Sequence, residues 1–104
     1  MTPAHTVDRA RWARMTIFEQ MGNIGSEVGR TLKAQRNGDD FEPALIRALD
    51  LFDATTQQLV TAKSSQTKEV LRSKDQFLEA VYGKQDPSIE NYFMQYALAA
   101  RLNR

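Results

Sequence analysis

Cysteine is absent from the 104 residues, and histidine occurs once, as His5. The lack of cysteine excludes disulfide bonds, thiolate catalysis, iron–sulfur clusters and cysteine-based zinc sites. A single histidine excludes a histidine-rich metal centre, and a Ser-His-Asp triad would depend on a residue near a chain end that we expect to be loose. We therefore expect a protein that is not an enzyme and that binds no metal and no cofactor.

A long hydrophobic run is also missing. The apolar stretch Tyr92–Ala100 is far shorter than the roughly 20 residues that span a bilayer. Residues 1–5 lack the basic-then-apolar layout of a signal peptide. Charged residues make up 26% of the chain and hydrophobic residues 41%, a balance typical of one folded soluble domain. We expect a cytoplasmic protein without a membrane partner.

Charge of one sign does not dominate, since 14 Lys and Arg face 13 Asp and Glu. The distribution is uneven, however. Residues 1–15 contain three arginines and one aspartate, whereas residues 39–63 contain five acids and two bases. This polarity favours charge complementarity within or between chains over binding to a polyanion.

Glycine and proline are few, and they mark where helices begin and end. Thr16 and Glu19 form a capping box at the start of the first long helix. Asn37-Gly38 ends that helix, because glycine readily adopts the left-handed conformation found after a helix C-terminus. Asp39 or Asp40 is the expected cap of the next helix, and Asp86-Pro87 the expected start of the last one. Gly83 ends the helix that precedes it.

These signals predict an all-α fold: an antiparallel bundle of four amphipathic helices at about 17–37, 41–63, 67–82 and 87–102. The bundle domain spans residues 16–104 and follows a short basic N-terminal arm, residues 1–15. The apolar residues expected to face its core recur three or four positions apart: Ile17, Met21, Ile24, Val28 and Leu32; Phe41, Leu45, Ala48, Leu49, Phe52, Leu59 and Val60; Val70, Leu71, Phe77, Leu78, Val81 and Tyr82; Ile89, Tyr92, Phe93, Tyr96 and Ala100.

Four stretches carry a resemblance: RWARMT at 11–16, NIGSEVGR at 23–30, ALDLFD at 48–53 and YFMQYALAAR at 92–101. In this order they resemble a family of small bacterial and archaeal helical-bundle proteins of this length with no known activity. The resemblance implies a helical fold and no particular ligand. At the level of fold alone, the chain is similar to the four-helix accessory proteins of diversity-generating retroelement reverse transcriptases. Those are much more basic, a difference that disfavours nucleic-acid binding.

The most unusual local feature is a set of small residues inside the first long helix: Gly22, Gly25, Ser26 and Gly29. They fall on one side of that helix. Because each glycine costs about 1 kcal/mol relative to alanine in a helix interior, a contact should offset the loss. We predict that Gly25 or Gly29 lies against another helix, of the same chain or of a second subunit. Their mid-helix position disfavours a phosphate site.

Surplus apolar side chains lie in the last helix, where Met94 and Leu98 face away from the main stripe and are candidates for a subunit interface.

Acidic residues suggest a further cluster, of charged side chains. Asp50 and Asp53, with Glu27, are expected to form an interhelical salt-bridge network with Arg30, Arg47 or Arg72 rather than a metal site.

Residues 7–15 could form a short helix, and they leave two alternatives open. Trp12 and Met15 pack onto the end of the bundle, since tryptophan is usually buried, or the arginines dock on a partner or on phosphate. The candidate phosphate contacts of the chain are Arg9, Arg11, Arg14, Arg30 and Lys33, together with Lys63.

The expected function is that of a non-enzymatic helical-bundle protein–protein interaction module. Its partner is the chain itself, in a homo-oligomer, or another protein for which it serves as an accessory subunit. The alternative is a nucleic-acid-binding accessory protein that uses the arginine-rich arm and the basic end of the first helix.

Overall fold

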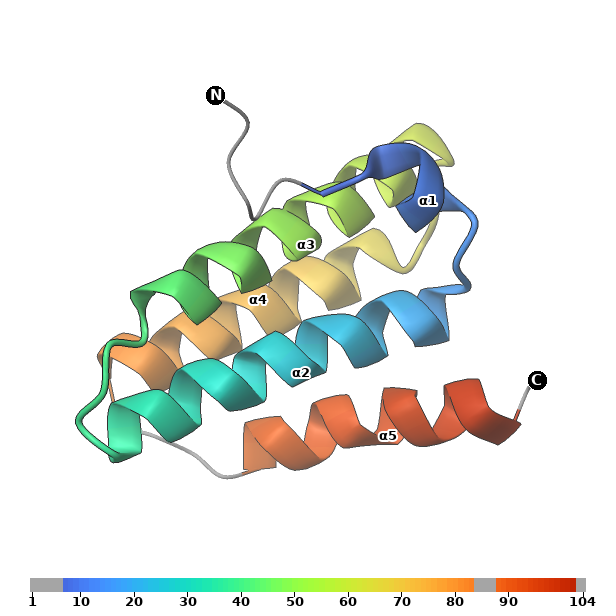
Figure 1. The fold of residues 1–104 in the computed structure, drawn as a ribbon. Coiled ribbons are helices and arrows are strands. Elements are labelled where there is room, and N and C mark those ends of the chain that lie inside the picture. The colour runs from blue at the N-terminus through green and yellow to red at the C-terminus, as the bar shows by residue number, and fades with distance from the viewer. Residues whose placement is uncertain (1–6, 84–87, 103–104) are drawn as a thin grey trace.

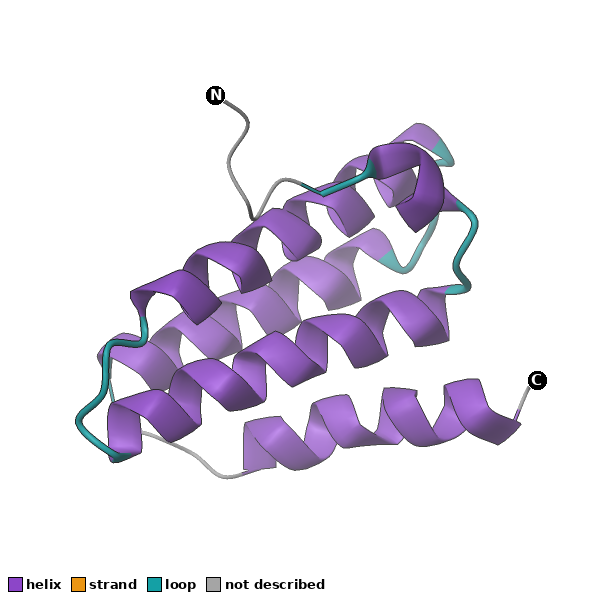
Figure 2. Ribbon diagram, in the orientation of Figure 1, coloured by secondary structure: helices purple, strands orange, loops and turns teal. Residues whose placement is uncertain are grey.

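A computed structural model of the chain describes residues 7–83 and 88–102. Its elements are α1 (Arg9–Ala13), α2 (Ile17–Arg36), α3 (Glu42–Thr61), α4 (Thr67–Tyr82) and α5 (Ser88–Leu102). These residues contain helices and no strand, as Figure 2 shows. The all-α prediction is therefore confirmed. Among the described helices, none has the length and apolar character needed to cross a membrane.

The predicted number of helices is wrong, because the described part of the expected N-terminal arm contains the additional helix α1. Asp8 caps it by accepting a hydrogen bond from the backbone N–H of Arg11. Trp12 is buried, and Met15 packs against the same core. A single turn is too short to show amphipathic periodicity in the sequence, so burial of the tryptophan is what orders this segment. His5 and Asp86-Pro87 lie outside the described residues.

The four long helices run in alternating directions along the chain (Figure 1). Helices α2, α3 and α4 surround the main core, and α5 lies along the side of α2. Helix α5 contacts α2 along most of its length and α4 far less. One face of α5 is thus covered by its own chain, while the opposite face is not.

The ends of α2 follow the sequence signals, whereas the start of α3 does not. Thr16 and Glu19 form the predicted capping box, and Gly38 adopts the predicted left-handed conformation with φ of 74°. The cap residue of α3 is Phe41, which makes no side-chain capping bond. Asp40 instead accepts a hydrogen bond from the backbone N–H of Glu42, so it supports the helix start from outside it.

Aromatic rings occupy the centre of the core. Phe52 lies 6.0 Å from Phe77 and 5.9 Å from Phe93 between ring centroids, which joins α3, α4 and α5. The interior residues of α2 match the prediction, and its largest members are Met21, Ile24, Val28 and Leu32.

Three residues that we predicted for the core are exposed: Val60, Leu71 and Tyr82. Val60 and Tyr82 lie in the last turns of α3 and α4, where Leu59 and Val81 take the buried positions. On α4 the buried face is completed by the small residues Ser73 and Ala80. The face that Val70, Phe77 and Val81 form is centred about 100° from the direction of Leu71, so Leu71 points to its edge and is exposed.

A buried polar network fastens α1 to α2 and α3. The indole N–H of Trp12 donates to Thr55 Oγ1 at 2.9 Å, and Thr55 Oγ1 donates to Gln20 Oε1 at 3.1 Å. The amide nitrogen of Gln20 donates to the Trp12 carbonyl and to Gln58 Oε1. Each of these buried groups therefore has a partner, which satisfies the main requirement for a polar group inside a protein.

We expect Thr55→Val to lower the free energy of unfolding by about 1–3 kcal/mol, because it leaves the Trp12 N–H and Gln20 Oε1 without their partner. Thr56→Val is the matched control. The Thr56 hydroxyl is buried without a hydrogen-bond partner among the described residues, so its removal should leave stability unchanged or raise it. Urea unfolding of both variants measures the difference. Equal losses in the two would contradict a special role for the network.

Candidate functional site

A hollow of about 250 Å³ opens to the surface between α2 and α5. Its lining consists of small residues from α2 and a mixed set from α5: Gly22, Gly25, Ser26 and Gly29; Glu90, Phe93, Met94 and Ala97. The four small residues predicted as a contact face, and the exposed Met94, thus meet at one place. Leu98 lies one turn beyond Met94 on α5.

The glycines of this hollow are not equivalent. A Cβ atom at Gly25 would lie 2.6 Å from Phe93 Cβ, and one at Gly22 would lie 3.3 Å from Ala97 Cα. Both positions let α5 approach the backbone of α2, as predicted for Gly25. At Gly29 a Cβ would meet nothing within 4 Å. The small residues that line the hollow thus include two that meet α5 and one, Gly29, that does not.

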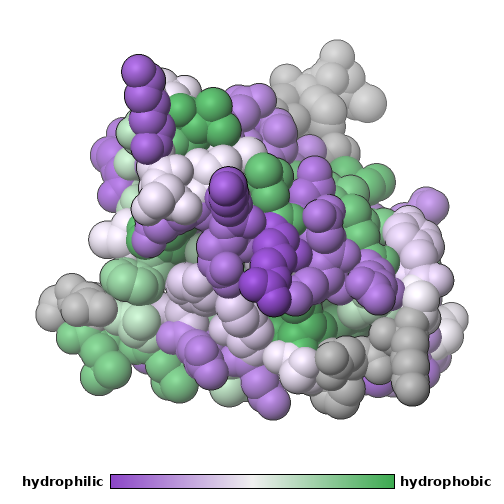
Figure 3. Space-filling view, turned by 180° about the vertical axis from the view of Figure 1, so that it is seen from behind, coloured by the Kyte–Doolittle hydropathy of each residue, from purple (hydrophilic) through white to green (hydrophobic). Residues whose placement is uncertain are grey.

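An apolar stripe borders the hollow on α5. Met94, Leu98 and Leu102 are four residues apart, on one side of the helix, and their exposed fractions are 58%, 49% and 84%. Figure 3 shows hydrophobic surface gathered beside the C-terminal end of α5. The remaining large exposed apolar residues are Ile46 and Val60 on α3 and Leu71 and Tyr82 on α4. The two residues of each helix are more than two turns apart, so neither helix carries a continuous apolar stripe like that of α5.

Opposite charges stand at the two ends of the stripe. Near the start of α5, Glu90 Oε1 accepts a hydrogen bond from Arg36 at 2.7 Å. Near its end, Arg101 is exposed and forms no ion pair with a described residue. The surface is therefore apolar in the middle, with a carboxylate that is paired to Arg36 at one end and an exposed arginine at the other.

Tyr92 holds α5 to α4 on the side away from the stripe. Its hydroxyl donates to Glu69 Oε1 at 2.7 Å and lies 3.2 Å from the hydroxyl of Tyr96. Burial, together with the hydrogen bonds to Tyr96 and Glu69, raises the pKa of Tyr92 above its ordinary value. Because the contacts of α5 with α4 are few, this phenol carries much of the connection.

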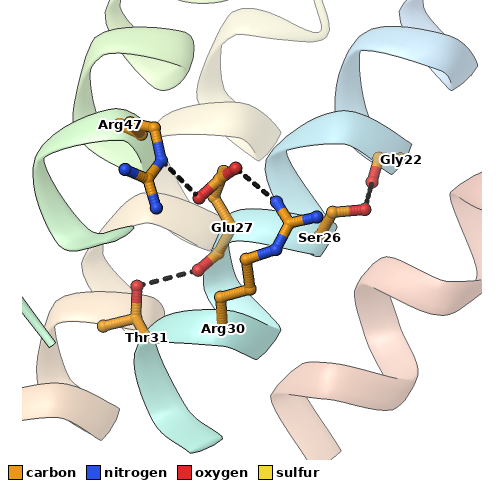
Figure 4. A network of polar contacts seen from close by, with 6 residues as sticks. All are labelled: Gly22, Ser26, Glu27, Arg30, Thr31 and Arg47. Carbon is orange, nitrogen blue, oxygen red and sulfur yellow. Dashed lines mark hydrogen bonds and ion pairs between the residues drawn. The ribbon is translucent and has the colours of Figure 1, made fainter. Parts of the chain in front are cut away.

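Part of the predicted salt-bridge network is present. Glu27 does hold two of the predicted arginines, Arg30 through Oε1 and Arg47 through Oε2, as Figure 4 shows. Asp53 belongs to a separate pair with Arg9 at 3.1 Å. Asp50 is half-buried on α3, and Arg72 is exposed on α4. Within the described residues, no group of three or more potential ligands could hold a metal ion.

The candidate phosphate contacts are divided between distant parts of the fold. Arg9 is occupied by Asp53 and Gln57, and Arg11 and Arg14 are exposed beside it. Arg30 and Lys33 lie in the second half of α2, toward the end of the molecule opposite α1 (Figure 1). Lys63 follows α3. The structure does not bring these cations to one surface.

Sequence reasoning missed part of this site. Phe93 was expected only in the core, yet its side chain also forms the floor of the hollow. Glu90 and Ala97 line the hollow, and Leu102 extends the stripe. The spacing of Leu102, four residues after Leu98, was the available signal. The position of Glu90 at the hollow involves an ion pair with Arg36 of α2, and no local sequence pattern predicts that pair.

Comparisons with known proteins add no relative: no family model, curated protein or solved structure matches the chain. The resemblance stated above therefore stays a prediction, and the geometry of the α2–α5 surface is what bears on function.

The two kinds of glycine predict opposite effects of the same substitution. Gly25→Ala should lower the free energy of unfolding by about 1–3 kcal/mol, because the new methyl group overpacks against Phe93. Gly29→Ala should raise it by about 1 kcal/mol through helix propensity, because its methyl group meets nothing. Thermal and urea unfolding measure both. Stabilisation by both substitutions would refute the close contact at Gly25.

A second prediction concerns pH. Since the pKa of Tyr92 is raised in the folded state, the unfolded chain releases this proton first, above about pH 10. The folded state then binds more protons, so the free energy of unfolding falls as pH rises. We expect a shallower fall in Tyr92→Phe, measured by urea unfolding across alkaline pH. Tyr82→Phe is the control for the loss of a tyrosine, and the same change of slope in both would contradict the prediction.

Proposed function

We propose that the protein is a non-enzymatic helical interaction module that binds a protein partner through the exposed face of α5 and the adjoining hollow. The observation that carries this proposal is the stripe of Met94, Leu98 and Leu102. Three apolar side chains in register on one helix face lose contact with water when a partner covers them, and burial of apolar surface is the main source of affinity between proteins.

The hollow beside the stripe supports the same proposal. A flat apolar stripe gives little shape specificity, whereas a recess next to a ridge accepts a side chain from a partner. Phe93 lines the recess, and the absence of a side chain at Gly29 keeps it open toward α2. The proposed function includes two cases: binding to further copies of the chain in a homo-oligomer, and binding to another protein as its accessory subunit.

The nucleic-acid alternative has weaker support. Arg9 and Arg30 are engaged by carboxylates, and the candidate cations lie on separate parts of the molecule. A groove that follows a phosphate backbone requires cations that converge.

The proposal predicts an assembly that depends on Leu98. The tagged full chain, expressed at its own level in the organism that makes it, should elute in size-exclusion chromatography as a complex larger than the chain alone. Leu98→Lys should weaken that complex by about tenfold or more, because it places a charge in the apolar contact. Leu71→Lys is the matched control, since Leu71 has a similar exposed fraction of 41% on α4.

Two results would overturn the proposal. One is a chain that elutes alone in every preparation. The other is a complex that Leu98→Lys and Leu71→Lys affect equally, which would show that its contact is not the α5 face.

A further inference from the structure

We infer that the partner on the α5 face is a second copy of this chain, bound with the two α5 helices antiparallel. The inference rests on the proposed function and names the partner of the same surface. It follows from the order of four residues on one side of α5: Glu90, Met94, Leu98 and Arg101.

The charges select both the partner and its direction. Glu90 and Arg101 are eleven residues apart, which is close to three turns, so they share a face and stand about 16 Å apart along the helix. A parallel second copy would set Glu90 against Glu90 and Arg101 against Arg101. An antiparallel copy sets each Glu90 against Arg101 of the partner subunit, twice over. The same pattern therefore complements itself in one direction only.

The charges also fix the register. When Glu90 faces Arg101 of the partner subunit, the two-fold axis falls between Gln95 and Tyr96. Position 98 of one helix then lies at the height of position 93 of the other, one residue from Met94. The exposed Met94 and Leu98 side chains of the two copies therefore pack against each other.

The existing ion pair does not prevent this contact. Glu90 binds Arg36 through Oε1, which leaves the other carboxylate oxygen for a second arginine. Glu27 in the same chain shows the arrangement, since its two oxygens bind Arg30 and Arg47 (Figure 4). Arg101 has no ion pair with a described residue to give up.

Charge reversal and mixing test the inference on the purified full chain by sedimentation velocity. The wild type should dimerise at micromolar concentrations. Glu90→Arg and Arg101→Glu should each raise the dimer dissociation constant by about tenfold or more, because each sets like charges against one another at both ends. An equimolar mixture of the two variants should regain dimerisation, since the mixed pair has opposite charges at both ends.

The control is Asp75→Arg, a charge reversal at an exposed position of α4, which should leave the dissociation constant unchanged. Circular dichroism of each variant confirms that it is folded. A dimer that tolerates both reversals, or variants that do not recover on mixing, would overturn the antiparallel contact.

The outcome is separable from that of the proposed function. A wild type that stays monomeric up to its solubility limit overturns the second copy as the partner. If a Leu98-dependent complex with another protein is nevertheless present in cells, the interaction function stands without self-association. If no Leu98-dependent complex exists in either experiment, both proposals fail.

Discussion

Gly25 and Phe93 set the distance between α2 and α5, because a Cβ at residue 25 would lie 2.6 Å from Phe93 Cβ. This approach lets the Phe93 ring reach Phe52 of α3, and the same aromatic cluster includes Phe77 of α4. A larger residue at position 25 would push α5 outward and separate that ring from the core. The arrangement of the last helix, and hence of everything displayed on it, depends on a missing side chain.

Helix α5 is held differently from the other long helices. Helices α2, α3 and α4 share the core, and the Trp12–Thr55–Gln20 network ties α1 to α2 and α3. Helix α5 relies on α2 for most of its packing and on Tyr92 for a polar link to α4. Because α2 is its main neighbour, the side of α5 that faces away from the other helices stays uncovered. The exposed Met94 and Leu98 are a consequence of this position in the fold.

The sequence predicted those features that depend on near neighbours in the chain. The capping box at Thr16 and Glu19 and the end of α2 at Gly38 follow from local chemistry, and both were correct. Helix α1 was only a possibility in the sequence, because its order comes from burial of Trp12 against a distant helix. Likewise, Asp53 pairs with Arg9 and not with one of the arginines that bind Glu27. That pairing depends on where α1 lies, which no spacing along the chain reveals.

The small-residue face of α2 divides into two parts with different physical roles. At Gly22 and Gly25 the lost helix stability is offset within the chain, because α5 occupies the space. At Gly29 the same cost of about 1 kcal/mol has no return from the chain itself, since nothing lies within 4 Å. That uncompensated glycine opens the hollow beside the Met94–Leu98 stripe. A partner side chain in the hollow would supply the missing contact, so the cost at Gly29 and the exposed stripe have one explanation in common.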